Sequence, residues 1–163
     1  MRADATTMPD SPPRSQRAIV GIVPTRPRAT SEASRRSMVA NSSRESALER
    51  DLRRHLFARG LRFRKHLRVL VDSRCQPDIV FTRARIAVFV DGCFWHRCPE
   101  HATDPRLNGE WWKAKLEANV ARDRSFDAAL TAAGWHVMRF WEHDEVDVMA
   151  GVIERAVRGA GDG

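Results

Sequence analysis

Apolar residues repeat at helical spacing soon after residue 41. Leu48, Leu52 and Leu56 lie four residues apart, so they share one face of a helix. Ser42–Glu45 has the form of a capping box, and Gly60 suits the end of a helix. The pattern therefore predicts a first helix between these two signals.

Two short apolar runs in the middle of the chain predict a β-hairpin. Pro77–Phe81 leads from an acidic residue into a β-branched run, and Ile86–Val90 is almost continuously apolar. Arg83–Arg85 between them favours a tight turn. A continuous apolar run is typical of a strand that is buried on both faces. Leu61–Val71, which precedes the hairpin, alternates loosely and is basic, so we expect an edge strand there.

In the second half of the chain, segments with helical spacing of apolar residues alternate with a segment that has the two-residue alternation of a strand. We expect a long helix over Glu110–Ala133, a third strand over Trp135–Trp141 and a terminal helix over Asp144–Arg158. In the terminal helix, we place Val148, Val152 and Ile153 on the apolar face. This order of elements predicts an α/β sandwich, with a central mixed sheet flanked by helices.

The first 40 residues differ in composition from the rest. They are rich in Arg, Ser, Pro, Thr and Ala and poor in large apolar side chains. Such a segment cannot bury enough surface to offset its ordering entropy. We expect a disordered basic arm at residues 1–40, which either helps to hold DNA or only solubilises the chain. The folded domain is expected at residues 41–158 and a flexible tail at 159–163.

The charge and the cysteines narrow the class of protein. The net charge of +7 favours a polyanionic partner such as nucleic acid, although a solvated basic surface is an alternative. Three cysteines, an odd number, argue against a disulfide framework and for a reducing compartment. No apolar run is long enough to span a membrane. We therefore expect a soluble, cytoplasmic protein with no membrane partner.

Metal-binding residue types are concentrated just after the second strand of the hairpin. Cys93, Cys98 and His101 offer thiolate and imidazole ligands at the short spacing of a tetrahedral zinc site. The fourth ligand must come from elsewhere, and His143 is the best remaining candidate. We predict one structural zinc ion. His96 lies within this segment, but histidine is also the usual general base near neutral pH.

Carboxylates at strand ends suggest a second metal site. Asp78 begins one strand of the hairpin and Asp91 ends the other, where oxygen ligands can hold Mg²⁺. Glu49 lies at the edge of the first helix's apolar stripe and can reach inward. Asp123 falls on the apolar face of the long helix, so it needs a partner such as a protonated histidine.

Exposed aromatic and basic residues suggest a nucleic-acid surface. Phe94 and Trp95 lie in a polar loop, and Trp112 is near the start of the long helix. Apolar side chains inserted between base steps unstack and kink DNA. Lys115 on the same helix is a candidate DNA contact, with a solvated helix face as the alternative.

These motifs together resemble a known family. Asp91–His96 reads DGCFWH. It follows Pro77–Val80, and it precedes Trp112, the segment Asn119–Arg124, and the pairs Gly134–Trp135 and Trp141–Glu142. This order resembles the Vsr-type very short patch repair endonucleases of bacteria, from about residue 38 to the terminal helix. The resemblance implies a restriction-endonuclease-like fold with a structural zinc. It also implies nicking of double-stranded DNA 5′ to the thymine of a T:G mismatch, which arises from deaminated 5-methylcytosine.

The resemblance also implies roles for individual residues. Asp78 would be the central ligand of the catalytic Mg²⁺ ions, expected to be two, with the backbone carbonyl of Val90 as a further ligand. His96 would be the general base, supported by Glu49 and Asp123. Phe94, Trp95 and Trp112 would intercalate beside the mismatch, and Cys93, Cys98, His101 and His143 would match the zinc ligands. Asp91 stands where some members carry histidine, and we expect it to add a second carboxylate near the metal ions.

Other functions fit parts of the pattern. A restriction-like nuclease that cuts matched DNA would use the same residues. A zinc-stabilised DNA-binding module would keep the basic surface and the zinc ligands but would need neither Asp78 nor His96. For the mismatch endonuclease, we expect a monomer near the bacterial nucleoid that also meets other mismatch-repair proteins.

Overall fold

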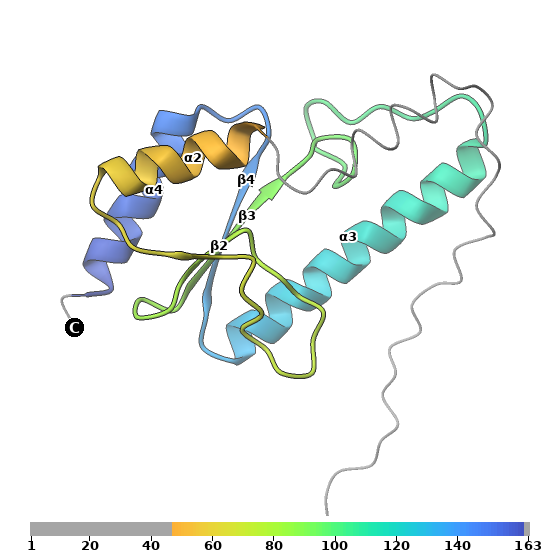
Figure 1. Cartoon of the computed structure of the whole chain (residues 1–163). Coiled ribbons are helices and arrows are strands. Elements are labelled where there is room, and N and C mark those ends of the chain that lie inside the picture. Colours follow the sequence, from red (N-terminus) through yellow and green to blue (C-terminus); the bar gives the residue numbers. More distant parts are fainter. Residues whose placement is uncertain (1–46, 162–163) are drawn as a thin grey trace, which may run out of the picture.

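The computed structural model, shown in Figure 1, describes residues 47–161. The predicted capping box and the N-terminal arm lie outside the described residues. The elements run in the order α2 Ala47–Ala58, β1 Arg64–Lys65, β2 Ile79–Phe81, β3 Ile86–Asp91, α3 Gly109–Ala132, β4 His136–Trp141 and α4 Val146–Gly159. Within residues 47–161, no helix combines the length and apolar character that crossing a membrane requires.

The strands of the described region form one mixed sheet in the order β1-β2-β3-β4. The predicted hairpin is confirmed, since β2 pairs antiparallel with β3 and places Phe81 opposite Ile86. β1 pairs antiparallel with β2, whereas β3 and β4 are parallel. The parallel pair requires a crossover connection, which α3 provides. The α/β class and the mixed sheet are therefore as predicted.

Strand β3 separates two apolar cores, as its continuous apolar run predicted. Ile86 and Val88 face the larger core, which α2 and α4 cover. Ala87 and Phe89 face a smaller core on the other side, together with Leu130 of α3. Figure 1 shows the same layers, with α2 and α4 side by side and α3 apart from them across the sheet. The sheet is thus the middle layer of the domain.

The predicted edge strand over Leu61–Val71 is mostly wrong. Only Arg64–Lys65 pairs with β2. The next residue, His66, has a positive φ of 48°, a left-handed conformation that turns the chain out of the ladder. Val71 is fully exposed, so the loose alternation of this segment does not mark a buried face.

The predicted apolar face of the terminal helix is partly wrong. Val148 is 59% exposed, whereas Met149, Ala150 and Ile153 are buried against α2 and the sheet. Val148 stands five residues before Ile153, a rotation of about 140° around the helix. It therefore points away from the core that Ile153 enters.

Candidate catalytic and metal-binding sites

One end of the sheet gathers the carboxylates that the sequence singled out. Asp78 precedes β2 and Asp91 ends β3, and antiparallel pairing sets the beginning of one strand beside the end of the other. The backbone N–H of Val90 donates a hydrogen bond to Asp78 Oδ2 at 2.8 Å. This bond fixes the orientation of the Asp78 carboxylate, whose oxygens are the type of ligand that hard divalent cations prefer.

Asp78 lies in poorly hydrated, negative surroundings. Burial raises the pKa of its carboxyl group to about 6, and the nearby charges of Glu49 and Asp91 add to the rise, while the Val90 N–H opposes it. Glu49 comes from α2, where its side chain is 14% exposed and lies 3.5 Å from Arg53 Nη1. Glu49 therefore does turn inward, as its place on the stripe edge predicted. A hard divalent cation would relieve the repulsion among these carboxylates.

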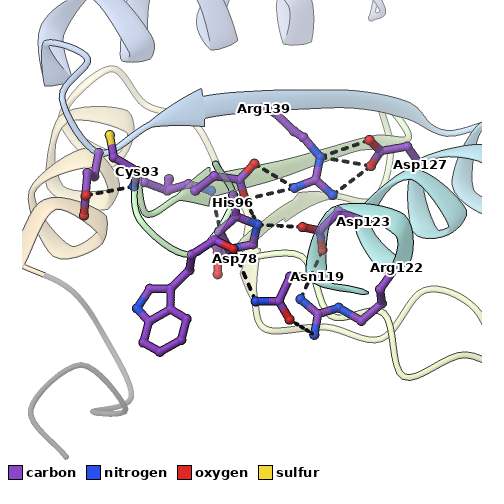
Figure 2. A network of polar contacts seen from close by, with 12 residues as sticks. Asp78, Cys93, His96, Asn119, Arg122, Asp123, Asp127 and Arg139 are labelled. Atoms are coloured by element: carbon purple, nitrogen blue, oxygen red, sulfur yellow. Dashed lines mark hydrogen bonds and ion pairs between the residues drawn. The ribbon is translucent and has the colours of Figure 1, made fainter. Parts of the chain in front are cut away.

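Asp123, the acidic residue on the buried face of α3 that was expected to need a partner, is paired with a histidine. Asp123 Oδ2 lies 2.6 Å from His96 Nδ1, and Figure 2 shows the two side chains facing one another. Burial lowers the pKa of His96, but the hydrogen bond to Asp123 and the charge of Asp91 outweigh it, so the pKa lies above its ordinary value. The loop is tied to α3 a second time, because Asn119 Nδ2 donates to the Trp95 carbonyl at 3.2 Å.

Two charged residues beside this pair were missed from the sequence. Arg139 of β4 contacts Asp91 and Asp127 at the same time, as Figure 2 shows for Asp127. Weak signals for both were present. Asp127 lies one helical turn after Asp123, and Arg139 is the only charged residue between Val137 and Trp141. Neither signal shows that the two residues meet.

The four predicted zinc ligands come together. One ligand atom each from Cys93, Cys98, His101 and His143 lies within 4.8 Å of all the others. Cys93 Sγ is 3.1 Å and Cys98 Sγ is 3.9 Å from His143 Nδ1. His101 Nδ1 is 3.2 Å from His143 Nδ1 and 3.8 Å from Cys98 Sγ. Ligand atoms around a tetrahedral zinc lie roughly 3.3–3.8 Å apart, given bonds of about 2.0–2.3 Å.

The surroundings of the two thiols differ, since burial, with the neighbouring Cys98 and Glu142, raises the pKa of Cys93 to about 11. Burial disfavours the thiolate of Cys98, but hydrogen bonds from the backbone N–H groups of Glu100 and His101 outweigh burial and lower its pKa. The backbone N–H of Cys93 donates to Glu142 Oε1 at 2.8 Å, which links this loop to the end of β4. Two thiols and two imidazoles converging in this way form a possible metal site.

The third cysteine is not part of this cluster. Cys75 is completely buried among Ala87, Phe89 and Leu130 in the smaller core. Burial raises the pKa of its thiol. It is therefore an apolar packing residue.

The predicted aromatic residues form one cluster between the loop and α3. The Phe94 ring lies 5.1 Å from Trp95 and 5.3 Å from Trp112, and these two tryptophans are 5.8 Å apart. Trp111 joins them at 4.8 Å from Trp112. All four side chains are half-buried, so part of each ring faces solvent. Lys115, also half-buried, follows Trp112 on the same helix.

Comparison with known proteins identifies relatives for most of the described chain. The family described as DNA mismatch endonuclease Vsr matches residues 29–101. The type II nicking enzyme V.NaeI of Lentzea aerocolonigenes is 47% identical over 122 residues, 73% of this chain and 74% of its own length. V.HpaIIP of Haemophilus parainfluenzae, also a type II nicking enzyme, is 33% identical over 140 residues, 79% of this chain and 97% of its own length. The DNA mismatch endonuclease Vsr of Escherichia coli K12 is 34% identical over 108 residues, 66% of this chain and 67% of its own length.

Proposed function

This chain belongs to the Vsr family of DNA mismatch endonucleases, and we propose that it nicks one strand of double-stranded DNA 5′ to the thymine of a T:G mismatch. Such a nick initiates very short patch repair of deaminated 5-methylcytosine. One observation carries the proposal: the half-buried Asp78 carboxylate and the His96–Asp123 pair lie at the same end of the sheet as the aromatic cluster.

Asp78 is the residue best placed to hold catalytic Mg²⁺. Its Oδ2 is fixed by Val90, and the acidic surroundings disfavour an uncompensated charge. The Val90 carbonyl suits a second ligand. The Val88 carbonyl points toward β2, where it accepts from the Asp78 N–H at 3.0 Å, and carbonyls two residues apart on a strand share a direction. Asp78 and the Val90 carbonyl would hold the Mg²⁺, expected as two ions, and the metal would supply charge stabilisation to the phosphodiester during cleavage. Glu49 is placed to orient water beside Asp78.

His96 supplies the general base in this proposal. With Nδ1 facing Asp123 at 2.6 Å, the proton on Nδ1 is held inward and Nε2 is the nitrogen able to take a proton from water. Asp123 then stabilises the imidazolium that forms. The proposed base, His96, and the carboxylate that would orient it, Asp123, are therefore already in contact without DNA.

We also propose that the Cys93, Cys98, His101 and His143 cluster holds one structural zinc ion. Its donor set and distances fit that metal. Phe94, Trp95 and His96 lie between the first two ligands, so the same cluster positions the aromatic residues and the base. Residues 41–158 would form the endonuclease domain, which we propose acts as a monomer. The roles of residues 1–40 and 159–163 stay predictions.

The nicking assay tests the proposal directly. Purified chain with Mg²⁺ is expected to cut only the T-containing strand of a T:G duplex, at the bond 5′ to that thymine. Rates are compared with those on the matched T:A and C:G duplexes of the same sequence. Equal cleavage of matched and mismatched DNA would favour the restriction-like nuclease, and binding without any cleavage would favour the zinc-stabilised DNA-binding module.

Removal of one ring of the aromatic cluster should selectively weaken binding to mismatched DNA. A base stacked on an aromatic side chain is worth about 1–3 kcal/mol, so Trp112→Ala is expected to raise the Kd for a T:G duplex by about 5- to 150-fold. Binding to the matched duplex should change little, because phosphate contacts remain. Leu107→Ala is the control, since Leu107 is 66% exposed just before the same helix. Equal loss of affinity for both duplexes would exclude an intercalating role.

A further inference from the structure

Arg139 of β4 contacts several groups at once, and none of the roles proposed for the site includes it. Its Nη1 lies 2.9 Å and 2.8 Å from the two carboxylate oxygens of Asp91. Its Nε lies 3.0 Å from both oxygens of Asp127, and its Nη2 lies 2.9 Å from Asp127 Oδ1. The guanidinium also stacks over the Phe89 ring at 4.3 Å. The arginine thus bridges β3 to α3 from the parallel strand β4, and its side chain has little freedom to move.

The contacts between Arg139 and Asp91 limit which other groups the Asp91 carboxylate can bind. Asp91 Oδ1 lies 3.6 Å from His96 Nδ1, while Asp123 Oδ2 lies 2.6 Å from the same nitrogen. Two carboxylates therefore compete for one histidine N–H. Because Arg139 contacts both oxygens of Asp91, it partly offsets that charge at His96, and the shorter contact leaves Asp123 as the stronger acceptor.

Helix α3 supports both halves of this arrangement. Asp123 contacts His96, and Asp127, one helical turn later, anchors Arg139 from the other side. The charges of Glu49 and Asp91 both act on Asp78, but Asp91 differs from Glu49 in that both of its oxygens contact one guanidinium nitrogen at 2.8–2.9 Å.

We propose that Arg139 is a positioning residue for the nicking reaction. It keeps the Asp91 carboxylate on its own guanidinium and just beyond hydrogen-bonding distance of His96, so that His96 turns Nδ1 to Asp123 and presents Nε2 to the substrate. The role of Asp91 is then to anchor Arg139 and not to bind metal. This inference rests on the proposed function of the site.

The kinetic test compares Arg139→Gln alone with Arg139→Gln combined with Asp91→Asn. The single variant leaves the Asp91 charge uncompensated beside His96, so kcat on the T:G duplex is expected to fall by about 100-fold, the scale of a misplaced catalytic group. KM for DNA should change less than about threefold, because no DNA contact is removed. The double variant removes the Asp91 charge beside His96 and leaves only the partly exposed Asp127 without its arginine, so it is expected to recover at least about tenfold of the lost kcat.

Arg59→Gln is the matched control. Arg59 also bridges two carboxylates, those of Asp147 and Glu154, and its side chain is 24% exposed, against 23% for Arg139. It lies between α2 and α4, away from Asp78 and His96. This variant should lose stability without a change in kcat, which separates the loss of an ion pair from the loss of positioning.

A spectroscopic measurement reads the histidine itself. In ¹⁵N-histidine-labelled protein, the His96 Nδ1–H signal that reports the bond to Asp123 is expected in the wild type, absent or shifted in Arg139→Gln and restored in the double variant. Unchanged His96 signals in Arg139→Gln, or a double variant no more active than the single one, would overturn the proposal. If Arg139→Gln does not fold, a double variant as inactive as Asp78→Asn overturns it instead. If the wild type nicks no mismatched duplex but the His96 signals change in Arg139→Gln and return in the double variant, the proposed function is refuted while the control of His96 by Arg139 is still supported.

Discussion

Asp78→Asn is expected to abolish nicking while the chain stays folded. Asp78 is the carboxylate proposed to hold the catalytic cation, and an amide oxygen binds a divalent cation far more weakly than a carboxylate does. The charge stabilisation that a catalytic metal gives to a phosphodiester is several kcal/mol, so kcat should fall by at least about 10³-fold. Single-turnover cleavage of the T:G duplex with excess protein measures this loss. A variant within tenfold of wild type would mean that Asp78 does not anchor the metal.

The same substitution has a predicted effect on stability with a definite sign. Because burial and neighbouring charges raise the folded pKa of Asp78 to about 6, its ionised form destabilises the fold at neutral pH in metal-free buffer. Asp78→Asn should therefore melt at the same temperature as the wild type or higher near pH 7.5. The difference should shrink as the pH falls through about 6, because Asp78 becomes protonated in the wild type. Asp51→Asn, on the exposed side of α2, is the control for the loss of one carboxylate from a surface ion pair.

Replacement of a zinc ligand is expected to have the largest effect on folding. Cys98→Ser should reduce bound zinc from about one ion per chain to almost none. Structural zinc binding is worth about 10–16 kcal/mol in small zinc-dependent folds, and here one site fixes the loop that holds Phe94, Trp95 and His96. We expect a strong fall in melting temperature and no nicking at any Mg²⁺ concentration. Elemental analysis and thermal denaturation measure the two effects.

Cys75→Ala is the matched cysteine control. Cys75 is buried in the smaller core and lies outside the ligand cluster. Loss of its small side chain should cost only about 1 kcal/mol and leave zinc content unchanged. If Cys75→Ala lost zinc while Cys98→Ser kept it, the proposed ligand set would be wrong.

The local pattern of the chain predicted most elements but not their exact partners. Ile86–Val90 is continuously apolar because β3 faces a core on each side, and this is a property that neighbouring residues reveal. The failures occurred where burial depends on distant segments. Val148 belongs to an apolar stretch, yet the rotation of α4 against α2 turns it outward. Loose alternation over Leu61–Val71 likewise did not reveal that His66 turns the chain away after two paired residues.

The proposed zinc ligands and the proposed catalytic residues differ in how much the sequence alone reveals about them. Cys93, Cys98 and His101 lie in one short loop, so spacing alone suggested a shared metal, and His143 was the remaining candidate. Asp78 and Asp91 were expected together because each flanks a strand of one hairpin. Asp123 was known to need a partner, since a charge on an apolar helix face is costly, but the partner itself was not identified by the pattern.

The sequence by itself determined the α/β order of elements, the hairpin, the metal-ligand types and the resemblance to the Vsr family. These follow from local periodicity and from residues close together in the chain. Only the tertiary structure decided that Arg139 contacts both Asp91 and Asp127, and that Nδ1 of His96 faces Asp123. Those contacts span up to 48 residues and depend on the parallel pairing of β3 with β4 across α3. Sequence patterns report which residues are buried or charged, whereas the choice between two acceptors for one N–H depends on distances that only the folded chain sets.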